Sequence, residues 1–151
     1  MIVGGGLPAA ATRQSQADAW LAPVMRYFVQ LVSSGDAETA KRACEFWTGI
    51  HAIGVAPWTT FYVCTRRAQL AKLFAALIDR MIFRDDVELA SFEGLCRAAE
   101  SAFETIVSVC PLQLVCATLI PLIETRTESE SWSVKEAAIR ALRAFTNAVG
   151  E

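Results

Sequence analysis

The side chains that most often carry out chemistry in proteins are scarce in this sequence of 151 residues. There is one histidine, His51, and the cysteines include no C-x-x-C pair, whereas metal and redox sites usually need closely spaced ligands of these types. Asp85 and Asp86 are adjacent, so their carboxylates diverge instead of facing each other across a cleft. The glycine run at 4–6 lacks the downstream Gly-Lys-Ser/Thr of a phosphate-binding loop. We therefore expect no enzymatic activity, no metal and no cofactor.

The cysteines are better explained as packing residues than as reactive ones. Their number is odd, which argues against a closed disulfide framework, and the closest pair lies in an apolar run where buried thiols behave as small hydrophobes. The five positions are Cys44, Cys64, Cys96, Cys110 and Cys116. Reduced core thiols predict a protein of a reducing compartment.

Composition excludes several classes of protein. With 54% hydrophobic and 20% charged residues, the chain has ample apolar surface to fold. Its net charge of −2 does not favour binding to nucleic acid. The uncharged stretches 46–65 and 105–123 approach the length that spans a bilayer, but glycines and prolines interrupt them, so we expect no membrane association. Residues 1–17 read as a flexible N-terminal tail, and residues 18–151 as the folded segment.

Apolar residues recur at three- and four-residue steps, which predicts helices and no strands. The expected helices cover about 20–32, 36–47, 66–83, 89–109, 111–123 and 133–149, with an irregular insertion at about 54–65 and a polar turn at 124–131. Asp36 is expected to cap the second helix, and Ser133 with Glu136 forms a capping-box pattern for the last. Pro121 is expected to bend the fifth.

Each aromatic residue could lie in the core or on a binding surface. Helical spacing favours core packing for Trp20, Trp47 and Trp132, and a structural role for His51. For Trp58, inside the insertion, burial and exposure remain equally open.

Three helices share a local pattern of charge followed by small residues. The marker alanines Ala43, Ala98 and Ala137 are spaced 55 and 39 positions apart, and their mean spacing suits two-helix repeats. The sequence therefore predicts an all-α fold, an α-solenoid of about three HEAT-like helical hairpins, with a closed helical bundle as the alternative. Hairpins of this kind bury their apolar faces on neighbours, so self-association through exposed solenoid ends is also expected.

Several blocks of the sequence resemble one family in the same order along the chain. They are Arg42–Trp47 (RACEFW), Leu73–Asp86, Leu95–Val107, Leu119–Leu122 and Trp132–Ala138. Together they are similar to the central HEAT repeats of the importin-beta family of nuclear import receptors, its transportin branch above all. The resemblance covers about 19–150 and implies a short central segment of such a receptor.

This resemblance implies nuclear import of proteins, with extended nuclear localisation signals of cargo, ending in a Pro-Tyr pair, bound on the concave helix face. Carried over by motif, the cargo-binding positions are Glu100, Ser101, Glu104 and Arg140. Ser101 leaves room for a peptide, and Glu104 suits a basic signal. Arg140 stands where the family has an aliphatic residue. The alternative is a HEAT-repeat scaffold for protein–protein interaction without a transport role.

The resemblance also implies partners and a location. Cargo proteins are the principal partners, nucleoporins are further candidates, and the cytoplasm and nucleus are the expected compartments. In the family, Ran GTPase acts through a long acidic loop, whereas here only 84–94 could take its place, with four carboxylates. We therefore expect this segment not to bind Ran tightly.

Overall fold

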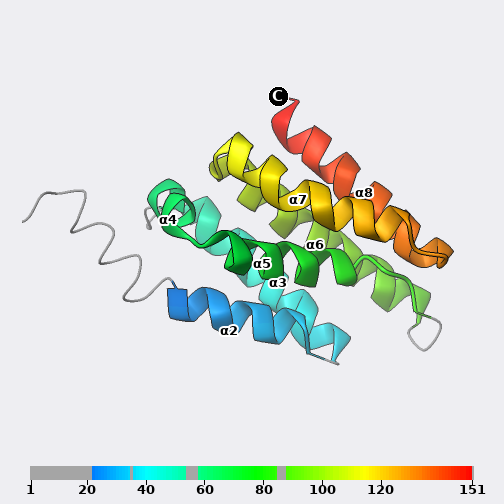
Figure 1. Ribbon diagram of the computed structural model, residues 1–151. Helices are drawn as coiled ribbons and strands as arrows, with labels where there is room; N and C mark the ends of the chain where they lie inside the picture. The colour runs from blue at the N-terminus through cyan, green and yellow to red at the C-terminus, as the bar shows by residue number, and fades with distance from the viewer. Residues whose placement is uncertain (1–21, 35, 54–57, 85–87, 151) are drawn as a thin grey trace, which may run out of the picture.

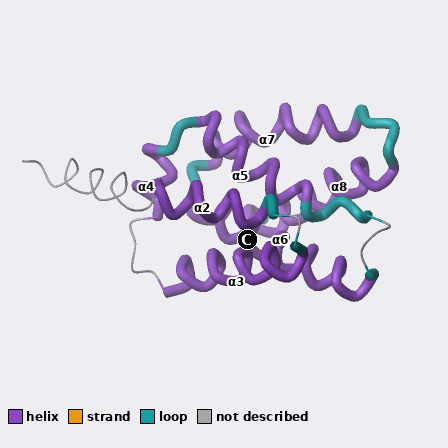
Figure 2. The backbone as a smooth tube through the Cα atoms, turned by 90° about the horizontal axis from the view of Figure 1, so that it is seen from below, coloured by secondary structure: helices purple, strands orange, loops and turns teal. Residues whose placement is uncertain are grey.

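The computed structural model describes residues 22–34, 36–53, 58–84 and 88–150, and over these residues the chain is helical with no strand (Figures 1 and 2). The helices are α2 (Ala22–Val32), α3 (Ala37–Ile53), α4 (Trp58–Cys64), α5 (Arg67–Asp79), α6 (Leu89–Val109), α7 (Leu112–Thr127) and α8 (Trp132–Val149). The expected N-terminal tail and Trp20 lie outside the described residues.

The helices form three hairpins stacked in two layers. The pairs α2–α3, α5–α6 and α7–α8 each pack together; α2, α5 and α7 form one layer, and α3, α6 and α8 form the other (Figure 1). The middle hairpin packs against both of its neighbours, whereas no extensive packing joins α2 or α3 to α7 or α8. An open stack of this kind is an α-solenoid, as the repeat spacing predicted, and differs from a closed bundle.

Local sequence explains most helix boundaries. Asp36 caps α3 as expected, because its carboxylate accepts the backbone N–H of Thr39 at 3.3 Å. The cap of α8 was predicted incorrectly: Ser131, not Ser133, accepts the Val134 N–H at 3.4 Å, so α8 begins at Trp132. The polar turn expected from residue 124 is also shorter, since α7 continues to Thr127.

The insertion between the first two hairpins is more ordered than its glycine and proline residues suggested. It contains the short helix α4, whose Trp58, Phe61 and Tyr62 are all buried. These residues follow one another at helical spacing, and this resolves the question left open for Trp58 in favour of burial. Trp132, by contrast, was predicted incorrectly as a core residue. It lies on a different side of α8 from the buried Ala137 and is 69% exposed.

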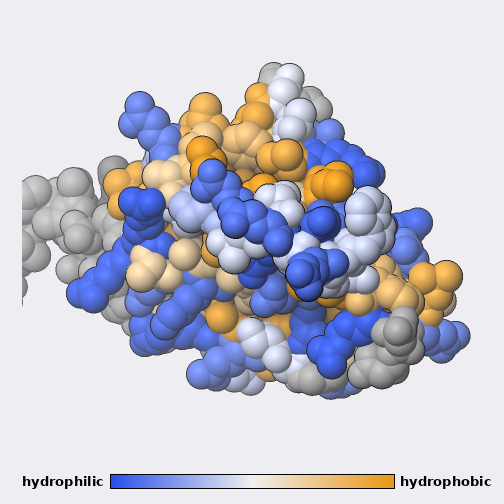
Figure 3. Space-filling model, turned by 45° about the vertical axis from the view of Figure 1, so that its right-hand side comes forward, coloured by the Kyte–Doolittle hydropathy of each residue, from blue (hydrophilic) through white to orange (hydrophobic). Residues whose placement is uncertain are grey.

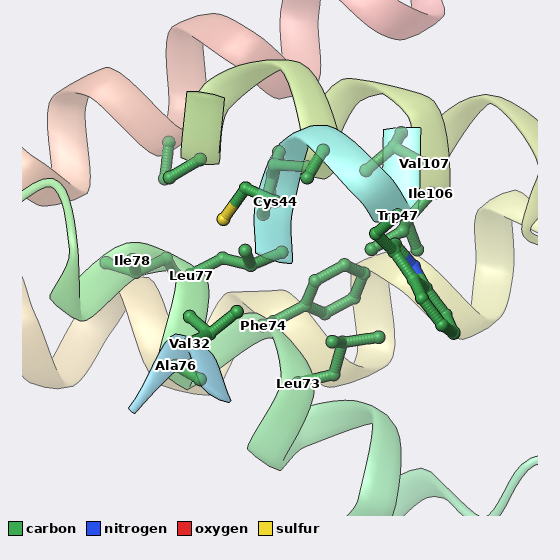
Figure 4. Packing of buried hydrophobic residues seen from close by; sticks show 14 of the residues in the cluster. Val32, Cys44, Trp47, Leu73, Phe74, Ala76, Leu77, Ile78, Ile106 and Val107 are labelled. Atoms are coloured by element: carbon green, nitrogen blue, oxygen red, sulfur yellow. The ribbon is translucent and has the colours of Figure 1, made fainter. Parts of the chain in front are cut away.

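The hydrophobic core lies between the two layers. Trp47 of α3 and Phe74 of α5 are fully buried in this core (Figure 4). Phe103 of α6 is also fully buried, and its ring centroid lies 5.2 Å from that of Phe74. The arrangement places the buried stripe of every long helix on the neighbouring layer and leaves the outer surfaces of α3, α6 and α8 free to form a binding face.

Pro121, inside α7, leaves one backbone carbonyl without its usual donor, and a side chain of another helix supplies a donor. Proline has no N–H, so Pro121 cannot donate to the carbonyl of Ala117 four residues earlier. The guanidinium of Arg67, at the start of α5, donates to that carbonyl oxygen at 2.8 Å. The unpaired acceptor left by the proline is therefore satisfied across the seam between the second and third hairpins.

Two further arginines connect neighbouring helices in the layer formed by α2, α5 and α7. Arg80 of α5 donates to the backbone carbonyl of Val32 at the end of α2, and Arg126 of α7 forms an ion pair with Asp79 of α5 at 3.0 Å. Each seam between consecutive hairpins in this layer is thus tied by an arginine that bonds to a neighbouring helix.

Candidate functional site

A groove runs between α3 and α6 on the outer surface of the second layer. Its volume is about 510 Å³, and we call it the α3–α6 groove. It is lined by Lys41, Glu45, Thr48, Gly49, Ala52, Gly94, Arg97, Ala98 and Ser101. Most of these side chains are small, so the two helix backbones form much of its floor, and a bound chain could come close to them.

The two helical glycines of this groove show how much room it offers. A Cβ atom added to Gly49 would meet nothing within 4 Å. One added to Gly94 would lie 3.6 Å from the Cε and Nζ atoms of Lys41, which is ordinary van der Waals contact. Glycine costs about 0.5–1 kcal/mol relative to alanine inside a helix. No neighbour among the described residues explains that cost at Gly49, which lies in open space on the groove.

Charged side chains of both signs border the groove. Lys41 and Glu45 lie on the α3 side and Arg97 on the α6 side, and none of the three forms an ion pair with the residues that the structure describes. Their charges are therefore available to a ligand. The groove can accept carboxylates or backbone carbonyls at its cations and a basic side chain at Glu45.

Of the residues expected to bind cargo, two remain accessible on this face. Ser101 is exposed and lines the α3–α6 groove, as a small residue that leaves space. Glu104 lies one turn further along α6, is half-buried, and has no ion pair within the described part of the chain. Ser101 therefore lines the groove itself, and Glu104 lies one helical turn beyond it on α6.

Glu100 and Arg140 are instead paired with each other. The Arg140 guanidinium lies 3.9 Å from a Glu100 carboxylate oxygen and 3.8 Å from Glu93, and it contacts the Cys96 sulfur. It also lies 5.9 Å from the centre of the Phe92 ring. Burial raises the pKa of Glu100, and the charge of Arg140 opposes that rise. Arg140 therefore joins α8 to α6, and its charge is already balanced by carboxylates of α6.

The lone histidine is part of a buried hydrogen-bond chain. The Trp47 indole N–H donates to the Tyr62 oxygen at 3.2 Å, and His51 Nε2 lies 2.9 Å from the same oxygen. His51 Nδ1 lies 2.8 Å from the backbone carbonyl of Trp47. Because a carbonyl only accepts, Nδ1 carries the proton and Nε2 accepts from the Tyr62 hydroxyl, so the ring is neutral. Burial lowers the pKa of His51, in keeping with the structural role expected for it.

The buried thiols are poor nucleophiles. Cys44, Cys96, Cys110 and Cys116 are free, and the first three are buried. Burial raises the pKa of Cys44 and of Cys110 to about 12, so both stay protonated at neutral pH and are poor nucleophiles. Within the described ranges, no group of histidine, cysteine and carboxylate side chains could hold a metal ion.

The sequence pointed to α6 but missed the α3 side of the groove. Lys41 and Glu45 were assigned to a helix with no site role, and Gly49 lay beyond the predicted end of that helix at residue 47, although all three line the groove together with residues of α6. A groove formed by residues of two helices is visible in the sequence only once the helices are known to be neighbours.

Comparison with known proteins does not assign this chain to a family. No family model matches the chain, and neither a curated protein nor a solved structure is significantly similar to it. Among the described residues, no helix is long and apolar enough to cross a bilayer.

Proposed function

We propose that this chain is a peptide-binding α-solenoid segment of the nuclear import receptor type, which binds an extended localisation signal of a cargo protein in the α3–α6 groove. The observation that carries the proposal is the open floor of small residues in this groove between α3 and α6. It is bordered by charges that form no ion pair with the residues that the structure describes. An extended chain fits such a floor because its backbone can approach both helices closely. The resemblance to importin-beta receptors supports the same face.

The charges of the groove indicate what kind of peptide it selects. Glu45 and Glu104 suit basic side chains, whereas Lys41 and Arg97 suit backbone carbonyls or an acidic residue. A signal with separated basic residues is therefore favoured over an unbroken basic run, which would meet these two cations. Arg140 takes no part in this proposal, because Glu93 and Glu100 already neutralise it.

The test is peptide binding by fluorescence anisotropy with a Gly49→Leu variant. A Cβ atom at residue 49 would meet nothing within 4 Å, so a leucine side chain would project from it into the groove. Removing a helical glycine also stabilises the fold by roughly 0.5–1 kcal/mol. We expect a labelled basic Pro-Tyr signal peptide to bind the wild-type chain and to lose at least about tenfold in affinity with the variant, which corresponds to about 1.4 kcal/mol.

A matched variant separates blocking from a general effect of added leucine. Gln113 is exposed on α7, in the opposite layer, so Gln113→Leu should bind the peptide as the wild type does. Glu104→Lys should weaken binding by reversing a charge beside the groove. Equal binding by the Gly49→Leu chain, or none by the wild type, would contradict the proposal.

A scaffold without a transport role is the second candidate. It is favoured by a separate apolar groove between α2 and α3, which is suited to a folded protein surface more than to a basic peptide. The two functions differ in the response to signal peptides: a scaffold would bind none of them and would be unaffected by Glu104→Lys.

A further inference from the structure

The outer edge of the first hairpin carries an apolar groove that nothing in the described structure covers. Its volume is about 340 Å³, and we call it the end groove. It is lined by Val24, Tyr27, Phe28 and Leu31 of α2 and by Thr39, Arg42, Ala43 and Phe46 of α3. Tyr27 is 62% exposed and Phe46 is 59% exposed. Apolar surface of this extent usually marks a place where another surface binds.

The repeat register identifies what fits this groove. The four lining residues of α3 each have a counterpart 55 positions later on α6, in the same register as the marker alanines Ala43 and Ala98. These counterparts are Gly94, Arg97, Ala98 and Ser101, which are the α6 residues that line the α3–α6 groove. There they face α3 itself. The α3 side of the end groove therefore corresponds to the surface of α6 on which α3 packs. A further helix could pack on α3 there in the way that α3 packs on α6.

The chain contains a helix with the matching surface at its other end. The α3 residues Glu45 and Thr48, which face α6 across the groove, correspond to Ile139 and Leu142 of α8, 94 positions later. Ile139 is 49% exposed and Leu142 is 48% exposed. Lys41 corresponds to another lysine, Lys135. Hydrophobic side chains gather over α7 and α8 at the upper part of the face in Figure 3.

The contact between α6 and α8 verifies this register independently. Glu100 of α6 is the counterpart of Glu45, and Arg140 of α8 is the counterpart of Ser101. Glu100 and Arg140 do face each other, with 3.9 Å between a carboxylate oxygen and the guanidinium. At the two ends of the stack, the corresponding positions are Ile139 on α8 and Phe46 on α3. Between α6 and α8 these two positions hold an ion pair, whereas at the ends of the stack they hold two apolar side chains.

We propose that two copies of this chain associate head to tail, with α8 of one copy covering the end groove of the next. Ile139 and Leu142 then pack on Phe46 and Tyr27, and the contact continues the hairpin stacking that already joins α3 to α6 and α6 to α8. The surfaces that meet are different on each copy, so the contact is heterologous and leaves one end groove and one α8 free for further copies. The α3–α6 groove lies on another face and stays open, so this proposal is independent of peptide binding.

The test is sedimentation velocity over a range of concentrations with two single variants. Phe46→Glu places a negative charge in the end groove, and Ile139→Glu places one on α8, so the two altered surfaces repel each other. Both positions are exposed, so circular dichroism should show unchanged helix content. We expect the wild-type chain to rise in weight-average mass from 16.5 kDa to at least twice that value as concentration increases, and each variant alone to remain at 16.5 kDa.

Mixing the two variants gives the sharpest result. The Phe46→Glu chain keeps an intact α8, and the Ile139→Glu chain keeps an intact end groove, so together they form one wild-type contact. The two altered surfaces are both negative and do not pair, so assembly stops at a dimer. Recovery in the mixture also shows that both variants are folded. A control, Val63→Arg, alters an apolar residue of α4 that is 58% exposed and outside both surfaces, and it should associate as the wild type does.

Three outcomes would overturn the proposal. A wild-type chain that stays at 16.5 kDa at high concentration would mean that the end groove is covered within one chain or by a different protein. An Ile139→Glu chain that still associates alone would mean that two end grooves pair with each other. Loss of association in Val63→Arg would mean that the contact is not specific to α8 and the end groove.

Discussion

The hydroxyl of Tyr62 links two buried groups, and its removal tests how the insertion is held on the first hairpin. In the folded chain it accepts the Trp47 indole N–H at 3.2 Å and donates to His51 Nε2, 2.9 Å away. Tyr62→Phe removes one oxygen and keeps the ring, which is fully buried, so the change in packing volume is small. Its effect therefore reports on the hydrogen bonds.

The expected cost follows from the two partners that remain. Trp47 is fully buried and His51 is 8% exposed, so water reaches neither polar group freely. A buried donor or acceptor left without a partner costs about 1–3 kcal/mol. Two such groups give an expected loss of about 2–6 kcal/mol in the free energy of unfolding. For a chain of this length, at about 2–4 °C per kcal/mol, that corresponds to a melting temperature lower by roughly 4–24 °C.

The assay is urea unfolding followed by circular dichroism, with both tyrosines compared. Tyr27 is 62% exposed, so Tyr27→Phe makes the same chemical change without burial and should alter the free energy of unfolding by less than about 0.5 kcal/mol. A loss below about 0.5 kcal/mol for Tyr62→Phe as well would refute the hydrogen-bond chain described for Trp47, Tyr62 and His51.

Two further predictions concern charge and the proline in α7. Burial lowers the pKa of folded His51 below its unfolded value of about 6.5, so the unfolded chain binds more protons. The contribution of neutral His51 to the free energy of unfolding should therefore be fully present above pH 6.5. It should fall as the pH drops toward the folded pKa, by at most about 1.4 kcal/mol per pH unit. Urea titrations of wild type and His51→Leu should show this slope only in the wild type; equal slopes would contradict it. Arg67→Met should cost about 0.5–1 kcal/mol in the wild type, because this hydrogen bond is exposed to water, and less in a Pro121→Ala background, where residue 121 can donate to the Ala117 carbonyl. A double-mutant cycle of unfolding energies with no coupling would exclude this exchange of donors.

Periodicity predicted most of the fold because the apolar stripes are long and clear. The bounds of α6 were predicted to the residue, and the marker alanines Ala43, Ala98 and Ala137 do lie on the three helices of one layer. The capping side chain of α3 was likewise visible, since Asp36 directly precedes the helix that it caps.

The errors arose where tertiary contacts decide the local structure. Helix α4 follows a glycine and a proline, which indicate a loop, but the burial of Trp58, Phe61 and Tyr62 against α3 stabilises a helix there. At α8, both Ser131 and Ser133 can cap a helix, and only the position of the first turn decides between them.

The binding face was partly predictable, because a resemblance can mark positions without showing their partners. Ser101 was assigned to a surface that leaves room for a peptide, and it does line an open groove. The pairing of Arg140 with Glu100 depends on how far α8 slides along α6, which no spacing within either helix reveals.

The α3–α6 groove is the central claim, and selective labelling of glycine amides tests it most directly. The chain has eight glycines, so a ¹⁵N-glycine spectrum contains few signals. Gly49 and Gly94 line the groove, whereas Gly150 lies at the end of α8. Titration with a basic Pro-Tyr signal peptide should shift the Gly49 and Gly94 signals and leave that of Gly150 in place. Unchanged Gly49 and Gly94 signals at saturating peptide would contradict the claim.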